Sequence, residues 1–117
     1  MKSIKTTDGY LVICALNEEV ISTLTKFAVD NNIHSGTIVG IGALKELTLG
    51  YYDMVERIYI KKDFHDEYEL LGLNGNFSWK DNETILHCHG VFSNKEFGVI
   101  GGHVFSAKVG ITGEFYI

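Results

Sequence analysis

The chain is mostly built of short apolar runs and alternating apolar and polar residues, and only one segment has the spacing of a helix. Residues 10–16 (YLVICAL) form a nearly continuous apolar run, which is typical of a buried strand. Residues 1–8 precede this run as an edge strand or arm, and Asp8-Gly9 is a turn signal between the two. The pattern therefore predicts a protein that begins with β-structure.

The segment 17–32 is the one clear helix prediction. Asn17 is predicted as its N-cap, with Glu18 and Glu19 in the first turn, where negative charge suits the helix dipole. The helix is expected to end near residues 30–32, because asparagine tolerates the left-handed conformation that closes many helices. One apolar stripe at helical spacing marks its buried face: Val20, Ile21, Leu24, Phe27 and Ala28.

Strands separated by turn signals account for the rest of the chain. The predicted strands are 37–44, 47–53, 67–73, 77–79, 84–91 and 104–111, with short pieces at 99–100 and 115–117. Residues 54–64 are ambiguous between a short strand and an extended edge, and Asn74-Gly75-Asn76 is a strong turn signal. We expect a hairpin to join 77–79 to 84–91 across residues 80–83.

Together these elements predict the α+β class: a mainly antiparallel sheet of about seven strands with one main helix, in a single domain spanning residues 1–117. Proline is absent and there are 13 glycines, which fits a β-protein with tight turns. Gly40 and Gly42 lie on one face of their strand, so another part of the chain should approach closely there.

Composition and charge exclude several kinds of partner. The net charge is −5 and Arg57 is the only arginine, so direct binding of duplex DNA is not expected. No apolar run is long enough to span a membrane and no leader segment is recognisable, so the expected location is the cytoplasm. In that compartment Cys14 and Cys88 are expected to be reduced thiols.

Three histidines and a cysteine are concentrated in residues 85–103 (ILHCHGVFSNKEFGVIGGH). If 85–91 is a strand, His87 and His89 point to the same face and Cys88 to the other. The two imidazoles, together with His103 from the next strand, could hold a metal ion and leave one position open. The alternative is that these histidines pack at the sheet surface or form hydrogen bonds in the core.

Two further features near this segment have weaker chemical interpretations. Gly98, Gly101 and Gly102 lack the lysine and hydroxyl residue of a phosphate loop, so they are interpreted as a turn that brings His103 back to the pair. Glu67 and Glu69 share one face of a predicted strand, and Glu69 is a candidate general base for a metal-bound water. Such residues are more often solvated or paired with lysine.

Three motifs together give the sequence a family resemblance. LHCHG at 86–90, FGVIGGHV at 97–104 and VGITGEFYI at 109–117 resemble the PPC family, the plants-and-prokaryotes-conserved domain. GYLVICAL, GIGAL and EYELLGLNGNF also fit, so the resemblance covers essentially the whole chain. It implies an α+β fold, a homotrimer and a metal site in which His87, His89 and His103 are the ligands.

The leading hypothesis is therefore a PPC-domain homotrimer that binds a divalent metal, with zinc expected because neutral imidazoles suit it. A water, a small anion or another small molecule would occupy the open position, and the sequence leaves open whether the protein is an enzyme. If it is, metal-assisted hydrolysis or lyase chemistry is expected. The alternative is a non-enzymatic regulatory or DNA-associated assembly module. The resemblance suggests it because plant relatives join this domain to AT-hook segments. This chain has no such segment.

Overall fold

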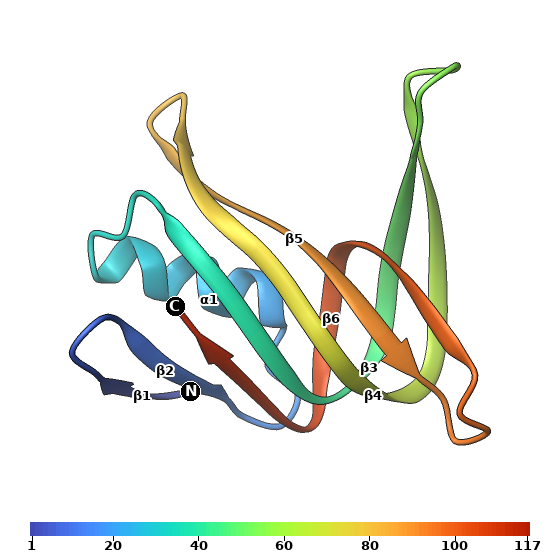
Figure 1. The fold of residues 1–117 in the computed structure, drawn as a ribbon, viewed down its shortest axis with the longest axis horizontal. Helices are drawn as coiled ribbons and strands as arrows, with labels where there is room; N and C mark the ends of the chain where they lie inside the picture. The colour runs from blue at the N-terminus through green and yellow to red at the C-terminus, as the bar shows by residue number, and fades with distance from the viewer.

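The computed structural model describes residues 1–117 as six strands and one helix in a single antiparallel sheet system. The elements are β1 (Lys2–Lys5), β2 (Tyr10–Cys14), α1 (Val20–Asp30), β3 (Gly36–Asp53), β4 (Ile58–Lys80), β5 (Glu83–Ser93) and β6 (Val99–Tyr116). The strand order is β1-β2-β6-β3-β4-β5, and β5 also pairs with β6. Because β5 pairs with both β4 and β6, strands β3 to β6 form a closed arrangement. The helix α1 lies beside β2, β5 and β6 (Figure 1).

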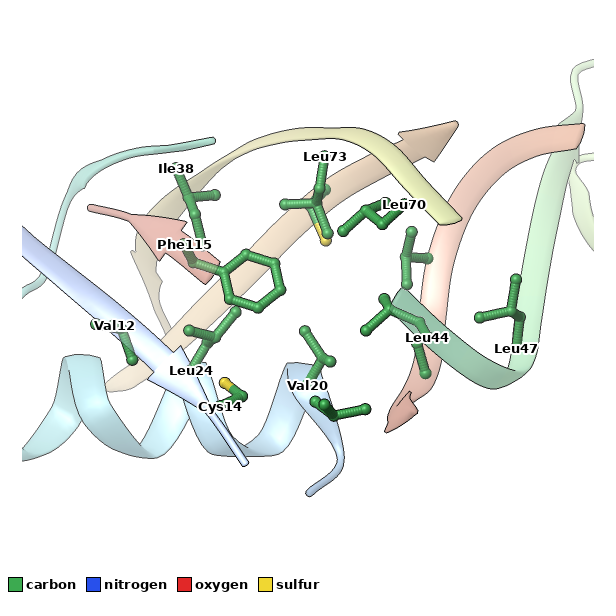
Figure 2. Close-up of a cluster of buried hydrophobic side chains, with 14 of the residues drawn as sticks. Val12, Cys14, Val20, Leu24, Ile38, Leu44, Leu47, Leu70, Leu73 and Phe115 are labelled. Atoms are coloured by element: carbon green, nitrogen blue, oxygen red, sulfur yellow. The ribbon is translucent and has the colours of Figure 1, made fainter. Parts of the chain in front are cut away.

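The core fills the space between α1 and the inner face of the sheet. The helix contacts β2, β5 and β6, and its stripe contributes Val20, Leu24, Phe27 and Ala28 to the buried set. Figure 2 shows Leu24 on α1 and Leu73 and Phe115 on the sheet pointing into this space. Burial of these apolar side chains is the main stabilising contribution to such a fold.

The α+β class is confirmed, but there are six strands rather than about seven, because β3 and β4 are longer than predicted. The predicted turn at residues 45–46 is only an irregularity between Lys45 and Leu47 within β3, where Glu46 has φ of 49°. The ambiguous segment 54–64 contains a turn and then the start of β4. The β3–β4 hairpin that results extends well beyond the rest of the sheet (Figure 1).

The predicted turn at Asn74-Gly75-Asn76 is wrong, because all three residues lie inside β4 and no glycine has positive φ. Gly75 is opposite Cys88 on β5, and a Cβ on Gly75 would lie 2.3 Å from the carbonyl oxygen of His87. Gly75 therefore permits the close approach of β4 and β5 and does not form a turn. Gly40 has the same role, since a Cβ there would lie 2.2 Å from the ring of Phe115.

We predict that Gly75→Ala destabilises the protein by about 1–3 kcal/mol, because the new methyl group must push β4 away from β5. Gly36→Ala on the neighbouring strand β3 is the control, since the nearest atom to the Cβ that it would add is Ile33 Cγ2, at an ordinary contact distance of 3.9 Å. That control should be neutral or slightly stabilising. Urea denaturation of both variants checks the difference, and equal stability of the two would contradict the close-approach explanation.

The helix begins later than predicted. Its N-cap is Glu19 and not Asn17, which has φ of 68° and lies before the helix. The Glu19 carboxylate accepts hydrogen bonds from the backbone N–H groups of Ile21 (3.1 Å), Ser22 (2.7 Å) and, across to β6, Ala107 (3.1 Å). The Glu19 side chain thus caps the helix, although the residues usually found at this position have shorter side chains. The predicted end near residues 30–32 is confirmed, with Asn31 as the C-cap.

The only helix has 11 residues, and no helix is long and apolar enough to cross a membrane.

Candidate metal centre

Strand β5 places two histidines on the outer face of the sheet. His87 and His89 are exposed, whereas Cys88 between them is 1% exposed and belongs to the core. Burial raises the pKa of the Cys88 thiol to about 12, so this group is a poor metal ligand. The predicted division of the two faces is confirmed. Both cysteines are free and buried.

Strand β6 brings His103 directly beside this pair, because His103 is the antiparallel partner of His89. The reversal lies at residues 94–98, where the Asn94 side chain accepts hydrogen bonds from the N–H groups of Glu96 (3.1 Å) and Gly98 (2.9 Å). Gly98 belongs to this turn as predicted, but Gly101 and Gly102 lie inside β6.

Gly101 and Gly102 have a different role from the predicted one. A Cβ on Gly101 would lie 2.9 Å from the carbonyl oxygen of Gly90, and one on Gly102 would lie 2.8 Å from that of Gly50. These two glycines allow β6 to lie between β5 and β3 without a clash. They hold His103 in register rather than turning the chain.

The three imidazoles face one another. The ring centroids are 5.1 Å apart for His87 and His89, 5.1 Å for His87 and His103, and 5.7 Å for His89 and His103. One ring nitrogen from each lies within 4.8 Å of the others. Since an ion with bonds of about 2.0–2.1 Å spans at most about 4.2 Å between two ligands, small side-chain rotations would complete a site.

The environment of His103 favours its neutral form. Burial lowers the pKa of His103 below its ordinary value of 6.5, and the neighbouring His87, His89 and Lys61 lower it further. The neutral imidazole has the free lone pair that a metal requires. His103 Nδ1 is also one of two buried side-chain polar atoms that have no hydrogen-bond partner. The donor set and this unpartnered nitrogen both fit a divalent metal such as zinc.

Residues from β4 border the histidines on their other side. Asn74 and Asn76 are the antiparallel partners of His89 and His87, and they line a cavity of about 160 Å³ with them. Residues directly opposite on paired strands share a face, so these amides are available to a ligand or to an imidazole N–H. The sequence interpretation missed them because it assigned both residues to a turn.

A second group that the sequence did not indicate consists of Tyr59 and Phe105. Their rings lie 5.1 and 4.4 Å from the ring of His103, centroid to centroid, and 5.0 Å from each other. No local pattern could have revealed this group, since Tyr59 lies in the segment whose structure was ambiguous. The two rings therefore lie against the His103 imidazole.

Glu69 does not join the histidines. It pairs with Ser93, four positions along β5 from His89, which is roughly 13 Å of strand. Glu69 and Glu67 instead line a separate cavity of about 250 Å³ with Ser93, Asn94 and Lys95. The cluster of possible metal ligands contains the three histidines alone. Within one chain, Glu69 is therefore too far away to act as a base on a water at this site.

The fold and the site define a class: small α+β domains that present three histidines on the outer face of a partly closed antiparallel sheet. Residues 1–117 match the Plants and Prokaryotes Conserved (PCC) domain, the family abbreviated PPC above, and the chain belongs to that family.

Solved structures agree with this assignment. A candidate DNA-binding protein from Bacteroides thetaiotaomicron is 31% identical, with a TM-score of 0.95 over 98% of this chain and 80% of that one. A plant- and prokaryote-conserved protein from Pyrococcus horikoshii is 30% identical, with a TM-score of 0.89 over 98% and 78%. A metal-containing protein from Archaeoglobus fulgidus is 31% identical, with a TM-score of 0.87 over 98% and 79%. No curated protein matches the chain.

Proposed function

We propose that this chain forms a homotrimer in which each subunit binds one zinc ion through His87, His89 and His103. The observation that carries the proposal is the convergence of three imidazoles from two paired strands on one face. The Archaeoglobus relative, described as metal-containing, supports it. Three protein ligands leave one position open for a small molecule, which is the arrangement of zinc sites that bind exchangeable ligands.

A bound zinc ion would supply a Lewis acid and lower the pKa of a coordinated water. The chain's own residues hold the site in place: β5 and β6 fix the imidazoles, Asn74 and Asn76 are available for hydrogen bonds, and Tyr59 and Phe105 pack against His103. Since no carboxylate joins the histidines, the primary role we propose is binding of a small molecule at the metal. Metal-assisted hydrolysis or lyase chemistry would need a base from outside this cluster.

Exposed apolar side chains support a trimer. A groove of about 450 Å³ on the sheet is lined in part by Leu11, Val39, Ile41 and Tyr116. The projecting β3–β4 hairpin carries further apolar residues, each at least half exposed: Tyr51, Met54, Val55, Ile58 and Ile60. Larger exposed apolar areas of this kind are typical of subunit interfaces.

Two measurements on the purified full chain test the proposal. Elemental analysis after incubation with zinc and gel filtration should find one zinc per chain, and light scattering should give about three times the 13.1 kDa chain mass. Wild-type protein that retains no zinc would refute the metal site. A monomeric mass would refute the assembly but not the site.

A second candidate function is a non-enzymatic module associated with DNA, favoured by the description of the Bacteroides relative as a candidate DNA-binding protein. The net charge of −5 opposes direct contact with phosphates. A titration with labelled duplex at about 10 mM salt, where electrostatic attraction is strongest, separates the two functions. We expect no binding by the isolated protein, and salt-sensitive binding would favour the second function.

A further inference from the structure

One row of residues runs across four paired strands through the histidine site. His89 on β5 is opposite His103 on β6, His103 is opposite Gly50 on β3, and Gly50 is opposite Lys61 on β4. Directly opposite residues point to the same face of a sheet, so the Lys61 side chain emerges on the face of the three histidines. The backbones of Lys61 and His103 are two strand spacings apart, which is roughly 10 Å.

Gly50 opens the path between them. Because Gly50 has no side chain, the Phe105 ring lies over its Cα: a Cβ there would be 2.3 Å from Phe105 Cε2 and 3.3 Å from Tyr59 Cδ1. The Lys61 ammonium lies 4.0 Å from the centroid of the Phe105 ring, and that ring is next to His103. Lys61 is thus directed along an aromatic surface toward the site.

With a divalent ion bound, the local charge at the site would be opposite in sign to that of the whole chain. Neutral imidazoles would leave a divalent ion with its full charge, and Lys61 adds one positive charge. The cluster of possible metal ligands contains no carboxylate, and the Asp63 carboxylate, two residues from Lys61 along β4, accepts a hydrogen bond from the Thr48 hydroxyl (2.7 Å). With a divalent ion bound, this site would therefore be cationic in a chain whose net charge is −5. Cationic sites bordered by aromatic walls attract anions more strongly than they do in open water.

We infer that the small molecule at the open metal position is an oxyanion of the carboxylate or phosphate type, and that Lys61 determines this specificity. One oxygen of the anion would coordinate the metal at its open position, and a second oxygen would accept a hydrogen bond from Lys61 Nζ. Tyr59 and Phe105 would contact the remainder of the molecule. The inference rests on the proposed metal site and adds the ligand class and the residue that selects it.

Cobalt-substituted full-length protein tests this, because the visible absorption of Co²⁺ changes when the open position is occupied. Wild type, Lys61→Gln and Lys62→Gln are titrated with inorganic phosphate and, separately, with acetate. Lys62 is the matched control, since it is the next residue on β4 and its ammonium lies over the ring of Phe64, 5.1 Å from the centroid. Alternate residues of a strand face opposite sides.

We expect Lys61→Gln to weaken binding of the preferred anion roughly 10- to 100-fold, as for a lost hydrogen bond to a charged group. Its cobalt content should equal that of wild type, and Lys62→Gln should bind the anion as wild type does. Comparison of phosphate with acetate identifies which oxyanion is preferred.

Each of the other possible outcomes would refute one part of the inference. Equal anion affinity in all three proteins, or equal weakening by both substitutions, refutes the role of Lys61 while leaving the metal site intact. Bound cobalt whose spectrum responds to neither anion refutes the oxyanion assignment. A wild-type protein that binds no cobalt refutes the metal site, and the inference about Lys61 fails with it.

Discussion

His103→Ala is expected to weaken zinc binding by more than about 100-fold, so that the variant loses its zinc on gel filtration. Removing an outer hydrogen-bond partner of a metal ligand typically costs about 10–100-fold in affinity, and removal of a ligand itself should cost more. The effect should be large because the remaining two histidines, His87 and His89, lie on one strand and cannot surround an ion alone. Elemental analysis and competition with a chromophoric chelator measure it.

The control for this variant is His65→Ala, because His65 is exposed and lies outside the cluster of possible ligands. It should keep one zinc per chain. Circular dichroism of both variants shows whether the sheet is retained, so that loss of metal is not confused with loss of fold. A His103→Ala protein that is folded and binds zinc as tightly as wild type would exclude His103 as a ligand.

Phe115→Ala is expected to lower the free energy of unfolding by about 3–5 kcal/mol. Phe115 is fully buried, and Gly40 and Gly113 leave space for its ring. Removal of a buried ring from a closely packed core leaves a cavity that the surroundings fill only in part. For a domain of this size the loss is a large part of the total stability.

Phe115→Leu separates the cavity effect from a general intolerance of substitution. It keeps an apolar side chain of more similar volume and should cost less than about 1.5 kcal/mol. Urea denaturation is run at one fixed protein concentration, because the stability of an oligomer depends on concentration. Similar losses for the two variants would show that the site tolerates no change, and small losses for both would contradict the packing described here.

The sequence predicted those features that depend on local pattern. Alternation along β5 placed His87 and His89 on one face and Cys88 on the other, because strand periodicity is set by the backbone itself. The stripe from Val20 to Ala28 predicted α1 for the same kind of reason. The joint histidine and glycine motifs predicted the family.

The sequence did not predict those features that depend on contacts between distant strands. Gly75 was interpreted as a turn because, in sequence, a glycine for turning and a glycine for close approach are identical. Tyr59 and Lys61 reach the site only through the pairing of β4 with β3, which no short window contains. The shared strand face of Glu67 and Glu69 suggested a base for the site, but the strand register pairs Glu69 with Ser93, away from the histidines.

The hairpin formed by β5 and β6 gives the site a degree of independence from the rest of the domain. All three imidazoles lie within residues 87–103, on either side of one short reversal held by Asn94. Bringing them together therefore costs little chain entropy, since the intervening loop is short. The site is therefore built by residues that are close in sequence, whereas Lys61, the residue that we propose selects the ligand, reaches it only through the pairing of β4 with β3.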